Sequence, residues 1–260
     1  MRALSGAPRP HPTPDCRRRA VQRFASTQPA RSIEIEAKFP FTEEDVRRIA
    51  SRGVQRATKV FTDRYWDNRP RNYPLTTSDI WLRQRDAAWE IKVPVGFYYR
   101  SRAGDDVTSA PSAVDRYKEL TNEAEISAFL RDRQFLRAAA AAAAAAGETA
   151  SLERSLLADA FAAFCCITTE RRTYECEGVT VTFDRATPLG YSVGELELLV
   201  DAAGDAAAAE RRIRSFARQF SLPIESRMPG KVLEQIRRSS PEHWAALQAS
   251  GLLRSKNVEA

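Results

Sequence analysis

Alternating charged residues near the start of the chain are the first candidates for chemistry. Residues 32–39 read Ser-Ile-Glu-Ile-Glu-Ala-Lys-Phe. Because successive side chains of a strand point to opposite faces, Glu34, Glu36 and Lys38 would share one face, and the apolar residues would share the other. Taken alone, this pattern is typical of a half-buried strand with a solvated charged face. A functional interpretation requires that other strands carry charges that meet these.

The same alternation recurs in later segments that have the composition of strands. The polar faces of these segments carry Trp81, Arg83, Arg85, Glu90, Lys92, Tyr117, Glu119, Arg171, Thr182, Asp184, Glu195 and Glu197. If the strands form one sheet that closes into a barrel, basic and acidic side chains line its interior. Desolvating an ion costs several kcal/mol, so such charges persist only when they are paired or bound to a ligand.

This mixture of bases and acids suits a polyphosphate that binds together with a divalent cation. Arginine forms two-pronged hydrogen bonds with phosphate oxygens, whereas carboxylates would repel a phosphate unless a metal ion bridged them. Carboxylate oxygens suit Mg²⁺, and also Mn²⁺, whose octahedral shell phosphate and water complete. The residues alone leave two interpretations open, a channel for a polyphosphate with metal and an ordinary sheet face exposed to solvent.

The order of the predicted elements favours an α+β domain with a mostly antiparallel sheet. Strands, helices, strands and helices follow one another without an alternating strand–helix rhythm. Apolar periodicity predicts strands over Val60–Asp67 and Ile167–Cys176, and helices over Leu152–Phe164 and Glu210–Phe220. The chain has no glycine-rich nucleotide loop, which argues against folds that bind nucleotides at a helix N-terminus.

The excess positive charge lies outside the predicted folded part. Seven arginines against one aspartate in residues 1–31 account for the whole formal charge of +6, so the rest of the chain is neutral. We therefore predict no nucleic-acid partner. No apolar run approaches the length of a membrane span, so no membrane association is expected. Four cysteines without metal-ligand spacing indicate a reducing compartment, and two histidines supply little zinc or acid–base chemistry.

Composition also divides the chain. Residues 1–31 are predicted to be a disordered, Arg-rich extension, either a mitochondrial transit peptide or a segment without a signal, so the expected location is mitochondrial or cytoplasmic. The folded domain is predicted over 32–247, with a low-complexity alanine insertion at 138–146 that has no chemical role. We expect 248–260 to be a flexible tail and the protein to be a monomer.

In combination, the motifs resemble the CYTH superfamily of triphosphate tunnel metalloenzymes. In the family's order they are Glu34-Ile-Glu36-Ala-Lys38, Phe61-Thr-Asp63-Arg-Tyr65-Trp66-Asp67, Trp81-Leu-Arg83-Gln-Arg85, Trp89-Glu-Ile-Lys92, Tyr117-Lys-Glu119-Leu, Gly190-Tyr-Ser-Val-Gly194-Glu195-Leu-Glu197 and Lys231. The resemblance covers about residues 32–247 and is greatest to the animal-type thiamine-triphosphatase branch. It implies a closed antiparallel β-barrel, with helices packed on the outside, that binds a triphosphate in its interior.

The resemblance also implies roles for individual residues. Phosphate oxygens would be clamped by Arg83, Arg85, Lys92, Arg171 and Lys231. Mg²⁺ or Mn²⁺ would be held by Glu34, Glu36, Asp184, Glu195 and Glu197. Glu195 and Glu197 would also orient the attacking water and are therefore catalytic candidates. Lys38 and Tyr65 resemble a catalytic pair linked to substrate preference. Trp81 resembles an aromatic platform for the thiamine rings. Tyr117 completes the predicted substrate-binding set.

The implied activity is metal-dependent hydrolysis of the terminal phosphate of an organic triphosphate, namely thiamine triphosphate to thiamine diphosphate and phosphate. Water would attack the terminal phosphorus directly, because phosphoryl transfer needs positioning and charge neutralisation more than a covalent nucleophile. One alternative is a tripolyphosphatase or nucleoside triphosphatase of the same fold, since the tunnel contacts the phosphates. Another is a polyphosphate-binding module without catalysis, which would bind its ligand without metal.

Overall fold

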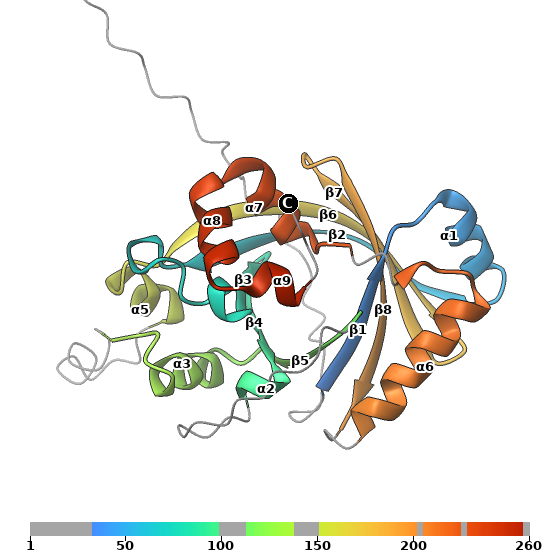
Figure 1. Ribbon diagram of the computed structural model, residues 1–260, viewed down its shortest axis with the longest axis horizontal. Helices are drawn as coiled ribbons and strands as arrows, with labels where there is room; N and C mark the ends of the chain where they lie inside the picture. The colour runs from blue at the N-terminus through green and yellow to red at the C-terminus, as the bar shows by residue number, and fades with distance from the viewer. Residues whose placement is uncertain (1–32, 99–112, 138–150, 202–204, 225–227, 257–260) are drawn as a thin grey trace, which may run out of the picture.

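A closed barrel of antiparallel strands forms the centre of the computed structural model, which describes residues 33–98, 113–137, 151–201, 205–224 and 228–256. Its strands are β1 (Ile33–Phe39), β2 (Val54–Asp67), β3 (Trp81–Arg85), β4 (Ala88–Pro94), β5 (Val114–Leu120), β6 (Ala162–Cys176), β7 (Val179–Thr187) and β8 (Tyr191–Val200). They follow the order β1-β5-β4-β3-β2-β6-β7-β8, and β8 pairs with β1 to close the barrel (Figure 1). The predicted α+β fold is confirmed.

Helices pack on the outside of this barrel (Figure 1). They are α1 (Glu43–Ala50), α2 (Val95–Tyr98), α3 (Glu123–Asp132), α5 (Leu152–Ala158), α6 (Ala206–Gln219), α7 (Lys231–Ser239), α8 (Pro241–Ala249) and α9 (Leu252–Ser255), with 3₁₀ turns η1 (Arg69–Arg71) and η2 (Thr76–Ser78). Helices α1 and α6 cover β1 and β6–β8, α3 and α5 cover β3–β5, and α7–α9 form a third cluster. Within the described residues, no helix has the length and apolar character needed to cross a membrane.

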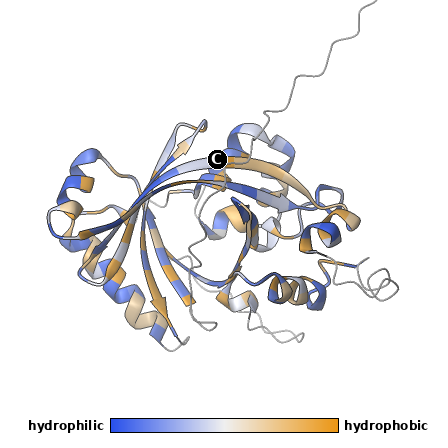
Figure 2. Ribbon diagram, turned by 180° about the vertical axis from the view of Figure 1, so that it is seen from behind, coloured by the Kyte–Doolittle hydropathy of each residue, from blue (hydrophilic) through white to orange (hydrophobic). Residues whose placement is uncertain are grey.

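The alternation of apolar and polar residues explains which face of each strand turns inward. In β1, Ile33 and Ile35 are fully buried in the cluster beneath α1 and α6, whereas Glu34 and Glu36 point into the barrel. Figure 2 shows the same alternation of hydrophobic and hydrophilic residues along the strands. Burying an isoleucine contributes about 1.5–3 kcal/mol, so the outer clusters hold the sheet in the register that turns its charges inward.

The contact between β1 and β8 depends on a glycine. Gly194 lies directly opposite Phe39, and a Cβ atom at Gly194 would come within 2.4 Å of the Phe39 ring. Any larger residue would therefore push the two strands apart. The Phe39 ring in turn packs edge-on against Phe183, with their centroids 6.1 Å apart. The next pair in this register places Lys38 opposite Glu195 inside the barrel.

Two predicted boundaries differ from the structure. Strand β2 begins at Val54, six residues before the predicted start, because its first half pairs with β6 in a two-stranded extension. The predicted helix over 152–164 ends at Ala158. Ala160 has a φ of 60°, which ends the helix, and residues from Ala162 onward pair with β2.

The expectation of a flexible tail over 248–260 is wrong for residues 248–256. Helix α9 forms there, and Leu252 and Leu253 are buried against Leu247 of α8. The apolar surface of these leucines holds the segment on the barrel, so the folded domain extends past residue 247 to Lys256. The segments predicted as an extension (1–31) and as an alanine insertion (138–146) lie outside the described residues.

Candidate active site

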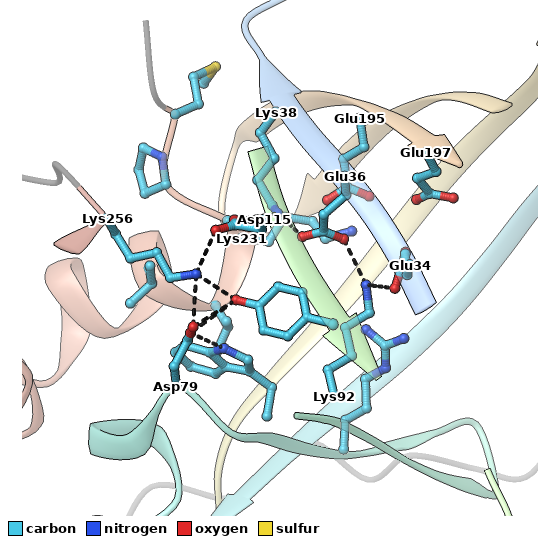
Figure 3. A pocket seen from close by; sticks show the side chains of 18 of the residues that line it. Glu34, Glu36, Lys38, Asp79, Lys92, Asp115, Glu195, Glu197, Lys231 and Lys256 are labelled. Atoms are coloured by element: carbon cyan, nitrogen blue, oxygen red, sulfur yellow. Dashed lines mark hydrogen bonds and ion pairs between the residues drawn. The ribbon is translucent and has the colours of Figure 1, made fainter. Parts of the chain in front are cut away.

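The inward-facing side chains line a cavity of about 240 Å³ inside the barrel. In the part of the chain that the structure describes, its charged lining contains seven acids and seven bases. The acids are Glu34, Glu36, Asp79, Asp115, Glu119, Glu195 and Glu197. The bases are Lys38, Arg83, Arg85, Lys92, Arg171, Lys231 and Lys256. Figure 3 shows these groups converging from several strands. The parity of the strands thus predicted the inner face correctly.

Two arginines of β3 are oriented by acids on β2, β4 and β5. Arg85 donates from Nε and Nη2 to the two carboxylate oxygens of Asp63, at 2.8 and 3.0 Å. Arg83 donates to Glu90 at 2.7 Å and to Glu119 at 3.1 Å. Burial alone would raise the pKa of Asp63, but the two guanidinium groups lower it below its usual value. Asp63 therefore stays charged and fixes the direction of Arg85.

Arg171 of β6 has the same arrangement on another side of the tunnel. Its Nε and Nη2 donate to the two oxygens of Asp184 at 2.6 and 2.7 Å, and Nη2 also donates to Glu195 at 2.9 Å. Lys231, the first residue of α7, donates to the same carboxylate of Asp184. Burial opposes ionisation, yet Arg171 and Lys231 hold the pKa of Asp184 below its usual value.

This arrangement corrects the predicted place of one metal ligand. Asp184 has no exposed surface and is not part of the cavity lining, because its oxygens are engaged behind Arg171. The other four acids predicted as ligands line the cavity. The side chain of Asp184 has the right parity, but parity does not say whether a short carboxylate reaches the cavity or stops at the wall.

Carboxylates outnumber their basic partners on the wall formed by β1 and β8. Glu34 and Glu36 share one lysine, Lys92, whose Nζ lies 2.7 and 2.8 Å from their oxygens. Lys38 also pairs with Glu36. Burial, opposed by Lys92 and reinforced by nearby carboxylates, raises the pKa of Glu34 to about 8. Burial and the neighbouring Glu195 and Glu36 likewise raise the pKa of Glu197 to about 7, against the effect of Arg171 and Lys92.

The donor chemistry of this wall fits a hard divalent cation. All four candidate groups are carboxylates, and the pKa values of two of them are raised chiefly by burial and further by the neighbouring carboxylates, against the lysines and the arginine beside them. No three Asp, Glu, His or Cys side chains among the described residues already converge as a ready-made metal shell. Phosphate oxygens and water would therefore supply the remaining ligands, as Mg²⁺ commonly requires.

The remaining predicted residues all line the cavity, but with different partners. Lys38 pairs with Glu36, whereas Tyr65 lies beside Arg83, so the two residues of the predicted pair have different partners. Burial raises the pKa of Tyr65 to about 12. Trp81 is buried at the cavity wall, where its Nε1 donates to Asp79 at 2.9 Å. Tyr117 Oη donates to the same carboxylate at 3.0 Å. Trp81 and Tyr117 thus lie together around Asp79 on one side of the tunnel.

Sequence reasoning missed several residues of the site. Asp63 and Phe61 alternate with Tyr65 along β2, so their parity marked them as inward-facing. The Phe61 ring lies 4.2 Å from the guanidinium of Arg85, and also contacts Arg171 and Lys231 at longer range.

Three further missed residues come from less regular segments. Asp79 precedes β3, Asp115 lies in β5, and Lys256 follows α9. No strand was predicted over Asp115, and Lys256 was assigned to a tail, so strand parity was not applied to either. The leucine pair at 252–253 was the available signal for a packed segment.

Comparison with known proteins agrees with this geometry. The family model of the CYTH domain matches residues 32–230. The chain belongs to the CYTH domain family. A thiamine-triphosphatase from Macaca fascicularis is 28% identical over 227 residues, which is 83% of this chain and 89% of that protein.

Two solved structures of Pyrococcus horikoshii proteins are also similar to this member of the CYTH family. The PH1819 protein has 17% identity and a TM-score of 0.48, and the similarity covers 73% of this chain and 90% of that one. The PH1012 protein has 17% identity and a TM-score of 0.43, with 74% of this chain and 92% of that one covered.

Proposed function

We propose that this CYTH protein hydrolyses the terminal phosphate of thiamine triphosphate, giving thiamine diphosphate and phosphate, with Mg²⁺ as cofactor and Mn²⁺ as a substitute. One observation carries the proposal. Inside a closed barrel, buried aspartates orient two arginines, and these arginines face a wall on which carboxylates outnumber their basic partners. The similarity to a thiamine-triphosphatase supports the choice of organic group.

The basic residues bind the triphosphate in this proposal. Arg83, Arg85 and Arg171 present guanidinium groups whose directions are set before the ligand arrives. Pre-oriented donors stabilise charge on the transferring phosphoryl group without reorganisation during the reaction. Lys92 and Lys231 add point charges along the tunnel wall.

The carboxylates of β1 and β8 would hold the cation. Among the described residues, the tunnel lining has as many acids as bases, so a triphosphate would bring negative charge that these side chains do not offset. When bound, Mg²⁺ neutralises phosphate charge and lowers the pKa of a coordinated water. Glu34 and Glu36 would be ligands, while Glu195 and Glu197 would both bind the cation and hold the attacking water by accepting its hydrogen bonds. Asp184 would position Arg171 rather than bind metal.

The substrate is tested with purified full-length protein and three triphosphates: thiamine triphosphate, inorganic tripolyphosphate and ATP. We expect the highest kcat/KM with thiamine triphosphate, loss of activity with EDTA, and recovery with Mg²⁺. A higher kcat/KM with tripolyphosphate or ATP would reject the thiamine assignment and favour the corresponding phosphatase.

A binding module without catalysis makes different predictions. It would bind tripolyphosphate equally well with EDTA and would release no phosphate from any of the three compounds. Calorimetric binding with and without Mg²⁺, measured beside phosphate release, separates the two functions. The surplus carboxylates favour the enzyme, because they would weaken a site that binds anions without a cation.

A further inference from the structure

The side chain of Lys256 reaches into the tunnel from a segment outside the barrel. Lys256 follows α9, and its Nζ lies 2.7 Å from an oxygen of Asp115 and 2.9 Å from an oxygen of Asp79 (Figure 3). It donates to Tyr117 Oη at 2.7 Å, and its Nζ lies 5.0 Å from the centroid of the Tyr117 ring. The ammonium group is thus held by two carboxylates and an aromatic residue. None of these contacts involves the arginines that are proposed to bind the phosphates.

The surroundings of this ammonium group form a rigid site for a cation. Asp79 accepts hydrogen bonds from Trp81 Nε1 at 2.9 Å and from Tyr117 Oη at 3.0 Å, so its carboxylate is fixed before any ligand binds. Asp115 remains 29% exposed and Lys256 16% exposed, so a ligand in the cavity can reach both. Carboxylates beside aromatic rings attract organic cations as well as ammonium groups.

The site also lies where the organic part of a substrate would lie. In Figure 3, Lys256 and Asp79 are on one side of the cavity, and Glu34 and Glu197 are on the opposite side. A triphosphate with its terminal phosphate near the carboxylates of β1 and β8 would extend its organic group toward the aromatic side.

We propose that Lys256 occupies the place of the substrate's positively charged organic group, and that Asp79 and Asp115 select triphosphates that carry such a group. This inference rests on the proposed function. A bound organic cation would exchange with the ammonium group, so neither carboxylate loses its partner. A triphosphate without an organic cation would leave Lys256 in place and would gain nothing from the two aspartates.

The exchange makes a quantitative prediction, because a site that is already occupied lowers the apparent affinity of a competing ligand. In Lys256→Met the aliphatic stem keeps its packing while the charge is lost. The ratio of the affinity for thiamine triphosphate to the affinity for inorganic tripolyphosphate should rise about tenfold. Taking the ratio removes the general loss of positive charge, which affects both ligands alike.

The experiment measures both dissociation constants by calorimetry in buffer with EDTA, using the full chain. Arg254→Met, an exposed neighbour in α9, is the matched control and should leave the ratio unchanged. Lys256→Arg keeps the charge and should also leave it unchanged. Adding Asp115→Asn to Lys256→Met should return the ratio toward its original value.

A ratio that falls or stays the same in Lys256→Met would overturn the inference and would make Lys256 a structural contact between α9 and the barrel. Because the readout is binding, a protein that binds both ligands but hydrolyses neither would refute the proposed function and still test this inference. Thermal unfolding of each variant verifies that the comparison is made between folded proteins.

Discussion

The tunnel and the cluster of Asp67, Thr76 and His243 are both buried and polar, but the cluster is not part of the cavity lining. In the cluster, one oxygen of Asp67 accepts hydrogen bonds from the backbone N–H of Thr76 at 2.8 Å and from its hydroxyl at 2.7 Å. His243 Nε2 lies 2.7 Å from the same hydroxyl, and the ring stacks on Tyr73. These contacts join η2 to α8.

The difference between the two regions lies in charge. Burial lowers the pKa of His243 to about 4, so this ring is neutral at physiological pH and its polar contacts serve to dock a helix. Among the described residues, fourteen charged side chains surround the open volume of the tunnel, and the carboxylates of β1 and β8 outnumber the basic groups that pair with them. Charge that remains available beside a cavity is therefore the feature that separates a ligand site from a structural polar contact.

The largest effect is expected from the carboxylates of β8. Replacing Glu195 and Glu197 together with Gln should lower kcat/KM for thiamine triphosphate about a thousandfold, because the proposed cation binding and water orientation would both be lost. Glu43→Gln, on the outer surface, is the control and should retain full activity. Steady-state phosphate release provides the measurement, with circular dichroism to verify folding. Substantial activity in the double variant would place the catalytic groups elsewhere.

The next largest effect is expected from the aspartate that orients Arg171. Asp184→Asn should lower kcat/KM about a hundredfold, because the direction of the Arg171 guanidinium is no longer fixed. The Mg²⁺ concentration that gives half-maximal activity should stay unchanged, whereas Glu197→Gln should raise it. A rise in Asp184→Asn as well would restore the role of metal ligand that the resemblance implied.

The cluster of Asp67, Thr76 and His243 should make the stability of the protein depend on pH. Because the folded pKa of His243 is about 4 and its usual value is 6.5, the unfolded chain binds more protons between these values. The contribution of His243 is therefore present above pH 6.5 and is lost as the pH falls toward 4, by about 2 kcal/mol between pH 6.5 and pH 4.5.

Urea unfolding of wild type and His243→Phe over this pH range isolates that contribution. The substituted ring can keep the stacking on Tyr73 but cannot titrate. The free energy of unfolding of the variant should therefore fall less steeply as the pH is lowered. If the two proteins lose stability in parallel, His243 is not the group responsible. Activity of the folded variant at pH 7.5 should match the wild type, in contrast to the tunnel variants.

The smallest effect concerns Phe61, the ring beside the tunnel cations. Phe61→Leu should lower kcat/KM about fivefold, since a cation–π contact of this kind contributes about 1 kcal/mol. The loss should appear mainly in KM if the ring orients Arg85 equally in the free and reacting states. Phe41→Leu, whose ring packs on Phe183 in the outer cluster, provides an aromatic control. Equal kinetics for Phe61→Leu and wild type would remove Phe61 from the site.

Much of the site followed from local sequence. The parity of β1, β3, β4 and β8 placed Glu34, Arg83, Lys92 and Glu195 on one face, because strand side chains alternate whatever the neighbours are. The closed barrel and the outer helices also agreed with the prediction. Parity could not show how far each side chain reaches into the cavity. Asp184 faces inward as expected but is held behind Arg171, which depends on the length of the side chain and on its partners across strands.

Strand alternation was enough to indicate which faces of the strands are charged, and the motifs were enough to indicate the family. Which charges pair depends on the three-dimensional fold, because β5 lies beside β1 in the barrel although three strands separate them in the chain. The same holds for Lys256, which α9 carries back to Asp79 and Asp115 across more than half of the chain. Local periodicity has no information about such contacts, since they arise from the closure of the barrel and the packing of helices on it.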